Sequence, residues 1–166
     1  KKFKELGVDN PNVFNDLDGY DYEAIAGTDP DIIIAPYSGM DEKEYKRLSE
    51  IAPTVPFKDV AWKTTWRDQL LEASEAVGMK DEGEKLVEET EKFIKDNVAK
   101  YPNLSGKSAA LCYIDAADLS KFSVYRTIDP RADYLVDMGF AFPEKVEAQA
   151  NDKDSFYVQI SSELAV

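Results

Sequence analysis

The sequence predicts an α/β fold in which short, buried parallel strands alternate with helices. Two uninterrupted apolar runs, at residues 31–35 and 109–114, are typical of parallel strands covered on both faces. Between them, residues 65–100 show the apolar spacing of a long helical segment. The element order strand, helix, strand, long helix, strand, strand, helix favours the α/β class.

Helical patterns and apolar runs also alternate before the long helical segment. Glycines mark the expected helix ends at Gly7 and Gly27, and Asp29-Pro30 leads into the first strand. The elements expected in this part are the last turn of a helix at 1–6, a short helix at 22–26, a strand at 31–35, a helix at 41–50 and a strand at 54–57.

The long helical segment has a clear start, a break and an end. Thr65 and Asp68 have the spacing of a capping box, in which a hydroxyl and a carboxylate satisfy free amide groups. Gly78 predicts a break, and Pro102 ends the helical pattern. Beyond it, the sequence predicts strands at 109–114 and 121–125, a helix at 129–139 and a helix start at 160–166.

The composition excludes several classes of function. The net charge is −13 over 166 residues, which argues against nucleic-acid binding because phosphates require clustered Lys and Arg. No histidine is present, so Ser-His-Asp catalysis and nearly all catalytic zinc sites are excluded. The single cysteine, Cys112, excludes an internal disulfide and is expected to lie in the core. No apolar stretch approaches the roughly 20 residues of a membrane span.

Aromatic and polar residues follow several of the expected strands. Arg126 comes directly after an aromatic residue at a strand end, and a guanidinium that stacks on a ring suits an anionic, aromatic-rich ligand. A surface ion pair is the alternative for Arg126, and partial core packing is the alternative for the aromatic residues. The candidate ligand contacts are Tyr37, Ser38, Trp62, Tyr125 and Arg126.

Two carboxylates give a different hypothesis. Asp115 and Asp118 follow the strand at 109–114, where sites of α/β proteins usually lie. They are compatible with a flavodoxin-like enzyme or a chelatase, whereas the simpler interpretation is a solvated loop. No Gly-rich phosphate loop is present, so nucleotide binding is disfavoured.

Five strings along the chain carry a family resemblance. In this order, they are similar to strings of the substrate-binding proteins of ABC importers for iron-siderophores, haem and cobalamin. The strings are YEAIAGTDPDIIIA at 22–35, LSEIAPTV at 48–55, the helical patterns at 66–78 and 82–100, YLVDMGF at 134–140, and ISSEL at 160–164.

The resemblance implies two small parallel-sheet lobes joined by a long backbone helix, with a ligand held between the lobes. Residues 1–60 would form the C-terminal part of the N-lobe, 61–102 the linking helix, and 103–166 the N-terminal part of the C-lobe. The fold would then be truncated at both ends, which agrees with a chain that begins at a helix end and stops at a helix start.

The resemblance also implies roles for single residues. Glu23 and Glu163 match the glutamates that contact the permease subunits of the importer, one from each lobe. The five strand-end residues would contact a ferric siderophore, with Arg126 as the first choice for pairing with its negative charge. The siderophore would hold the iron itself, so no catalytic residue, protein metal ligand or cofactor is expected.

The ligand class and location follow from the same resemblance. Haem or cobalamin are the alternatives to a siderophore, although the absence of histidine disfavours haem with a histidine ligand. The family is extracytoplasmic, so the protein is expected in the periplasm or as a cell-surface lipoprotein. Its contact with the membrane would be through an N-terminal lipid anchor that this chain has lost.

Overall fold

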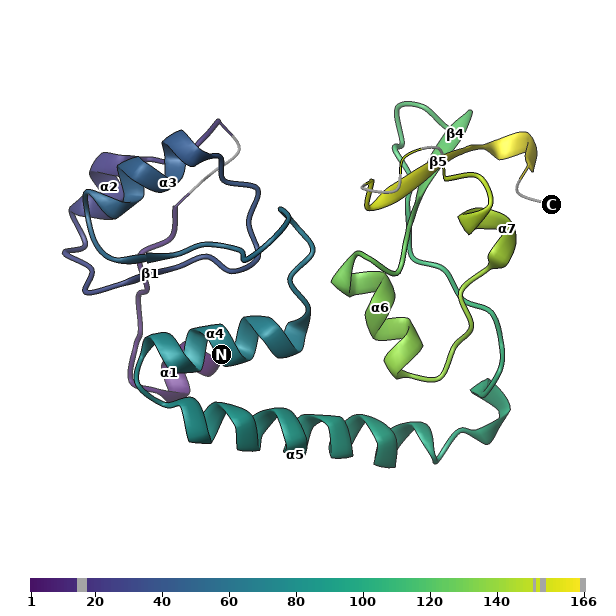
Figure 1. The fold of residues 1–166 in the computed structure, drawn as a ribbon, viewed down its shortest axis with the longest axis horizontal. Helices are drawn as coiled ribbons and strands as arrows, with labels where there is room; N and C mark the ends of the chain where they lie inside the picture. Colours follow the sequence, from purple (N-terminus) through teal and green to yellow (C-terminus); the bar gives the residue numbers. More distant parts are fainter. Residues whose placement is uncertain (15–17, 151, 153–154, 165–166) are drawn as a thin grey trace. The chain divides into compact units, whose positions relative to one another are not determined.

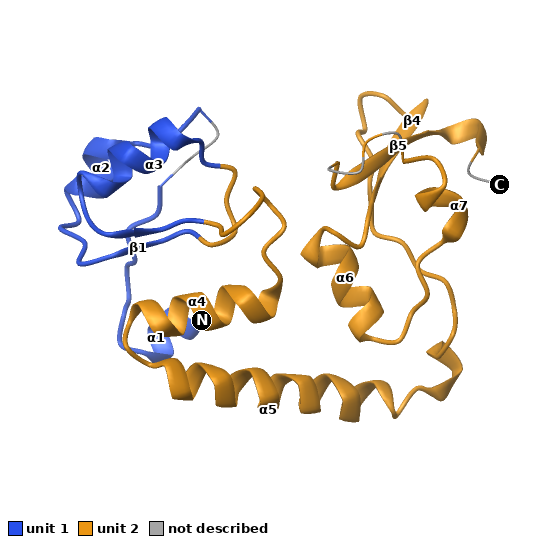
Figure 2. Cartoon of the chain, in the orientation of Figure 1, with its two compact units in different colours: residues 1–35, 40–56 blue, residues 36–39, 57–166 orange. Residues whose placement is uncertain are grey.

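The computed structural model describes residues 1–14, 18–150, 152 and 155–164 (Figure 1). The chain divides into two compact units (Figure 2). Unit 1 consists of residues 1–35 and 40–56, and unit 2 consists of residues 36–39 and 57–166. The loop 36–39 therefore leaves unit 1 and packs with unit 2.

Unit 1 contains a small parallel sheet, as the sequence predicts. Ile33 lies opposite Thr54, and Ile34 lies opposite Val55. The strands are shorter than expected, and Ile34 is partly exposed, so the first apolar run is not buried on both faces. The elements are α1 (Lys2–Glu5), α2 (Tyr22–Ala26), β1 (Ile33–Ile34), α3 (Glu42–Ser49) and β2 (Thr54–Val55).

Local capping and one packed side chain organise the helices of unit 1. The Asp41 side chain accepts from the Glu44 amide while the Glu44 carboxylate accepts from the Asp41 amide, so α3 begins with a capping box. Leu48 of α3 is fully buried. The Arg47 guanidinium lies 3.8 Å from the centre of the Tyr22 ring, which joins α3 to α2.

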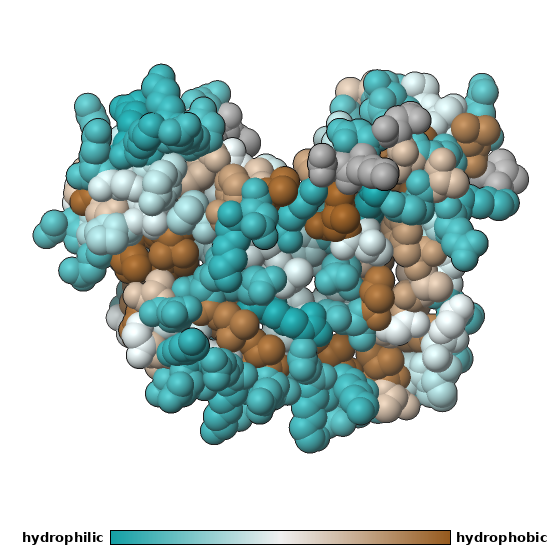
Figure 3. Space-filling view, in the orientation of Figure 1, coloured by the Kyte–Doolittle hydropathy of each residue, from teal (hydrophilic) through white to brown (hydrophobic). Residues whose placement is uncertain are grey.

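Unit 2 begins its helical part with α4 (Trp66–Ala76) and α5 (Lys80–Val98), and the expected break at Gly78 is confirmed by its φ of +75°. The Thr65 hydroxyl accepts from the Asp68 amide and donates to the Asp68 carboxylate, so Thr65 is the cap. A Cβ atom at Gly83 would lie 1.9 Å from the Ser74 hydroxyl, so the two helices meet closely there. Figure 3 shows hydrophilic side chains projecting along α5.

The remainder of unit 2 is built on an antiparallel sheet with the order β3-β4-β5. The expectation of parallel strands is wrong for this sheet, although an isolated parallel bridge pairs Ser108 with Ala141 outside it. Val124, Val158 and Ile160 form its core. The elements are η1 (Pro102–Leu104), β3 (Cys112–Tyr113), β4 (Lys121–Tyr125), α6 (Pro130–Asp137), α7 (Glu144–Glu147), β5 (Tyr157–Ser161) and η2 (Ser162–Leu164).

Three further expectations fail in this part, each for a physical reason. β3 is only two residues long and exposed, because it lies at the edge of the sheet; Cys112 is therefore exposed and is not a core residue. The expected helix start at 160 is instead the end of β5, in which buried and exposed residues alternate with the period of two of a strand. Only the single 3₁₀ turn of η2 follows it within the described residues.

Candidate ligand-binding site

The loop that leaves β1 is held against the segment that precedes α4. The Trp62 amide donates to the Ser38 carbonyl oxygen at 3.2 Å. The rings of Tyr37 and Trp62 meet edge to face, with their centres 5.1 Å apart. Gly39 makes this approach possible, because a Cβ atom at that position would lie 2.4 Å from the indole nitrogen of Trp62.

Trp62 adopts a backbone conformation that is unusual for a large residue. Its φ is +64°, in the left-handed region that side chains other than glycine seldom occupy. Strain of this kind persists only where surrounding contacts enforce it, and it often marks functional sites. The amide bond to Ser38 and the ring contact with Tyr37 are the contacts that hold Trp62 here.

Asp129, Arg131 and Tyr125 form a cluster at the start of α6, which we call the arginine clamp. Asp129 is completely buried and caps the helix, since its carboxylate accepts from the Arg131 amide at 2.9 Å. The same carboxylate accepts from Nε of Arg131 at 2.9 Å and from Nη2 at 2.7 Å. The guanidinium lies 4.1 Å from the centre of the Tyr125 ring, at the end of β4.

This clamp fixes the arginine and leaves part of it accessible. The Arg131 side chain is 46% exposed, whereas the Asp129 side chain is fully buried. Among the described residues, the recorded bonds of the guanidinium use Nε and Nη2, so Nη1 is available to a ligand. A pre-oriented guanidinium loses little side-chain entropy when it binds an anionic group.

Tyr37 belongs to the same electrostatic environment. Its pKa is raised, chiefly by burial and then by the negative charge of Asp129, whereas the charge of Arg131 lowers it. Tyr125 also contributes to the raised pKa. Charges act on one another mainly over short distances, so the loop after β1, the end of β4 and the start of α6 lie near one another in unit 2.

Arg126, the first choice from the sequence, lies in a different setting. Its side chain is 7% exposed and donates to Glu147 through Nε at 3.1 Å and through Nη2 at 2.5 Å. Nη1 donates to the carbonyl oxygens of Asp152 and Ser155 at 3.0 and 2.7 Å. The buried guanidinium of Arg126 thus ties the end of β4 to α7 and to the segment before β5, and these contacts use donors that the sequence-based prediction assigned to a ligand.

The other expected contacts divide into two groups. Tyr37, Trp62 and Tyr125 lie in the region around Arg131, and Tyr125 also stacks on Phe156 with ring centres 6.1 Å apart. Ser38 is buried, and its carbonyl oxygen positions Trp62.

The sequence interpretation did not include Asp129 and Arg131 among the candidate site residues. Their signal is the string Asp129-Pro130-Arg131 at a helix start that directly follows a strand. An acidic cap two residues before an arginine places the carboxylate beside the guanidinium, and Pro130 fixes the first helical position.

The alternative site at Asp115 and Asp118 is explained by loop structure. The Asp115 side chain accepts from the Ala117 amide, and the Asp118 side chain accepts from the amide and hydroxyl of Ser120. Each carboxylate thus closes its own turn. Among the described residues, no three His, Cys, Asp or Glu side chains are grouped so that they could hold a metal ion.

Both expected permease contacts lie on the surface. Glu23 is exposed on α2 of unit 1, and Glu163 is exposed on η2 of unit 2. No helix in the described part of the chain has the length and apolar character needed to cross a membrane.

Comparison with known proteins identifies the family. The family model described as periplasmic binding protein matches residues 3–165. The chain belongs to the periplasmic binding protein family. This family comprises binding proteins for transport, not enzymes, and it is the family that the sequence strings resemble.

Individual members of the periplasmic binding protein family agree with this. The chain is 29% identical over 168 residues to the probable siderophore-binding lipoprotein YfiY of Bacillus subtilis, covering all of this chain and 47% of YfiY. Its sequence is 43% identical to that of PiaA from Streptococcus pneumoniae, whose crystal structure is in complex with ferrichrome. The two structures match with a TM-score of 0.88 over 99% of this chain and 55% of PiaA.

A third structure shows the same fold at lower identity. Staphylococcus aureus SirA in complex with staphyloferrin B is 23% identical, with a TM-score of 0.72 over 98% of this chain and 54% of SirA. The chain therefore spans about half the length of the relatives that it matches.

Proposed function

We propose that this chain is part of the solute-binding component of an ABC importer that captures a ferric siderophore and delivers it to a membrane permease. The observation that carries the proposal is the arginine clamp, in which buried Asp129 holds half-exposed Arg131 against the Tyr125 ring. The resemblance to ferrichrome-bound PiaA supports a siderophore of the ferrichrome kind as the ligand.

The chemistry of the site suits such a ligand. The oxygen atoms that surround iron in a siderophore carry negative charge, and a guanidinium offers them a planar set of donors. The rings of Tyr37, Trp62 and Tyr125 supply apolar surface and polar edges around the clamp. In this proposal the siderophore provides all iron ligands, and the protein needs no cofactor or direct metal bond.

The domain division and the location are parts of the same proposal. Residues 1–60 and 103–166 would belong to the two lobes, and residues 61–102 would link them. The family and the lipoprotein relative support an extracytoplasmic protein, in the periplasm or on the cell surface, which reaches the membrane through a lipid anchor.

A titration followed by tryptophan fluorescence tests the ligand. The ferric siderophore quenches nearby indoles, so ferrichrome should reduce the emission of Trp62 with saturation, and iron-free ferrichrome should compete weakly. Haem and cyanocobalamin, tested in parallel, distinguish the alternatives. Saturable binding of haem or cyanocobalamin without binding of ferrichrome would overturn the siderophore assignment.

Docking on the permease is tested separately through Glu23 and Glu163. An exposed carboxylate can form an ion pair with a permease arginine and set the orientation of the complex. The double variant Glu23→Ala and Glu163→Ala should bind ferrichrome normally but lose uptake in cells. A matched variant with Glu84→Ala and Glu88→Ala, two exposed glutamates of α5, should retain uptake. Normal uptake by the first variant would refute the docking role.

A further inference from the structure

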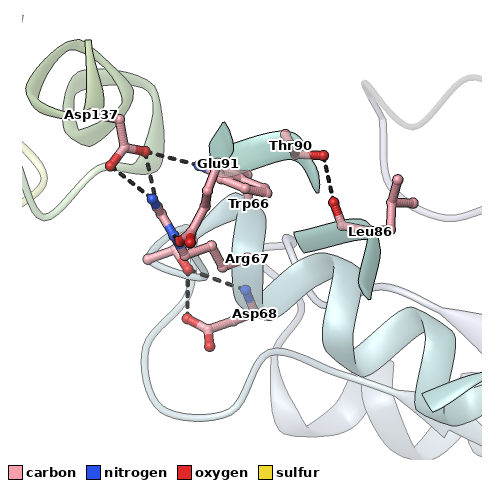
Figure 4. Close-up of polar contacts among 8 residues, drawn as sticks. Trp66, Arg67, Asp68, Leu86, Thr90, Glu91 and Asp137 are labelled. Carbon is pink, nitrogen blue, oxygen red and sulfur yellow. Dashed lines mark hydrogen bonds and ion pairs between the residues drawn. The ribbon is translucent and has the colours of Figure 1, made fainter. Parts of the chain in front are cut away.

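A polar network joins three helices of unit 2 away from the arginine clamp (Figure 4). Arg67 in the first turn of α4 donates to Asp137, the last residue of α6, through Nη1 at 2.9 Å and Nη2 at 3.0 Å. Its Nε donates to Glu91 of α5 at 2.5 Å. The indole nitrogen of Trp66 donates to Asp137 at 2.9 Å, and the Arg67 guanidinium lies over the Trp66 ring.

The network connects the two elements that carry the candidate ligand contacts. Trp62 precedes Arg67 by five residues, in the segment that leads into α4. Arg131 lies in the first turn of α6, and Asp137 is the last residue of the same helix. The contact between Arg67 and Asp137 therefore fixes the end of α6 opposite to the arginine clamp.

We propose that Arg67 and Asp137 are positioning residues that set the placement of Arg131 relative to Trp62, and thereby the fit of the ligand site. The proposal rests on the proposed function for its effect on ligand affinity. Neither residue needs to touch the ligand, because α6 transmits the constraint along its length.

The dimensions of α6 explain why the distant end matters. Arg131 and Asp137 are six positions apart, which corresponds to about 9 Å along a helix axis. A tilt of about 10° around one end of such a helix moves the other end by about 1.5 Å. Binding sites require their contact groups within about 0.5 Å of the productive geometry. A loosened Asp137 would therefore misplace Arg131.

The contact between Arg67 and Asp137, which we call the anchor of α6, has features that fix the end of the helix precisely. The two parallel bonds between guanidinium and carboxylate fix direction as well as distance. The Asp137 side chain is 18% exposed, so water competes little for its oxygens. Glu91 and the Trp66 ring limit the guanidinium from two further sides, which restricts Arg67 to one orientation.

The first test compares two Asp→Asn variants. Asp137→Asn should lower the affinity for ferrichrome about tenfold, because one charged partner of the anchor is lost. Asp96→Asn, which removes an exposed ion pair with Lys92 on α5, should leave the affinity unchanged. Arg67→Lys keeps the charge but not the paired bonds, so its affinity should lie between those of the wild type and Asp137→Asn.

The second test needs no ligand. Spin labels at Lys85→Cys on α5 and Tyr134→Cys on α6, in a Cys112→Ser background, report the distance between these helices. The distance distribution should broaden in Asp137→Asn and remain narrow in Asp96→Asn, with both variants folded by circular dichroism. Broadening together with weaker ferrichrome binding supports the proposal.

The two tests separate the possible failures. An unchanged distance distribution in Asp137→Asn overturns the positioning role, whatever the affinity. A broadened distance distribution with unchanged ferrichrome affinity would show that the network positions α6 but does not affect the ligand site. If the wild-type protein does not bind ferrichrome, the proposed function fails, and a broadened distribution still establishes that the network positions α6.

Discussion

Arg126 directly follows β4, and Arg131 lies five positions later in the first turn of α6. Each of the two guanidinium groups pairs with a carboxylate. In the first pair the arginine is the buried partner, because Arg126 is 7% exposed and Glu147 is 48% exposed. In the second pair the order is reversed, because buried Asp129 holds a half-exposed Arg131.

Which partner is buried determines whether the donors of the arginine are used within the protein or are left for a ligand. When the arginine is the buried partner, its donors must be satisfied within the protein, as the carboxylate and two carbonyl oxygens around Arg126 do. When the carboxylate is the buried partner, it orients the arginine and leaves donors for a ligand. The exposure of each partner therefore indicates, better than its sequence neighbours do, which arginine can offer donors to a ligand.

The same substitution at both arginines tests this comparison, and the largest effect on stability is expected at Arg126. Arg126→Lys keeps the charge but loses two or three of the four hydrogen bonds that the guanidinium makes to described residues, which should lower the free energy of unfolding by about 3 kcal/mol. Denaturant unfolding measures the loss. The ferrichrome affinity of the folded fraction should not change. A large loss of affinity would mean that Arg126 contacts the ligand.

Arg131→Lys should show the opposite profile. A lysine cannot keep both bonds to Asp129 and also stack on Tyr125, so the ferrichrome affinity should fall about 10- to 30-fold, or about 1.4–2 kcal/mol. Its half-exposed side chain limits the loss of stability to about 1 kcal/mol. The measurements are the titration and the unfolding curve used for Arg126→Lys. Unchanged affinity would contradict the assignment of the clamp as the ligand contact.

Much of the fold could be predicted from local patterns in the sequence. The α/β class is confirmed, α2 and β4 have the expected bounds, and the break at Gly78 and the caps of α3, α4 and α6 lie at strong local signals. The antiparallel direction of the second sheet could not be predicted in this way, because strand direction depends on distant pairing. The bonds between β4 and β5 join residues more than 30 positions apart.

The candidate site shows the same limit. Tyr125 and Arg126 are adjacent at the end of β4, so the sequence alone favoured the arginine next to the aromatic residue. The choice depends on Glu147, 21 residues later in α7, which takes up the Arg126 guanidinium. Partners this distant in sequence leave no local pattern, whereas the string from Asp129 to Arg131 shows its pairing within three residues.

A substitution at Gly39 tests the aromatic side of the site, where a smaller effect is expected. Gly39→Ala would place a methyl group 2.4 Å from the indole nitrogen of Trp62, so the ring must move away from Tyr37. The affinity for ferrichrome should fall about fivefold, with a shifted Trp62 emission maximum. Gly106→Ala is the matched control, because a Cβ atom there meets nothing within 4 Å, although its positive φ costs some stability. Equal affinities would show that Trp62 does not contribute.

The smallest expected effect is a pH dependence of the stability that comes from two carboxylates of α6, Asp137 and Asp133. Burial would raise the pKa of Asp137, but the bonds from Arg67 and Trp66 and the Arg67 charge lower it overall. Asp137 therefore stabilises the fold above the ordinary carboxyl pKa near 3.8, and this contribution is lost as the pH falls through its lowered value. Asp133, also on α6, has a pKa that is raised by burial and by the charge of Asp137. Its ionised carboxylate therefore lowers the stability of the fold at neutral pH, and this loss of stability diminishes on acidification.

Unfolding curves between pH 7 and pH 3 should show that Asp137 and Asp133 have opposite effects on the free energy of unfolding. The stability difference between the wild type and Asp137→Asn should begin to shrink as the pH falls below 3.8, because the carboxyl group takes up a proton in the unfolded chain before it does so in the folded protein. Asp133→Asn should be more stable than the wild type at pH 7 and lose this advantage on acidification. Glu91 faces the same guanidinium from α5, so Glu91→Gln shows how much of the change it contributes. A pH-independent difference for Asp137→Asn would mean that its carboxylate does not stabilise the end of α6 through its charge.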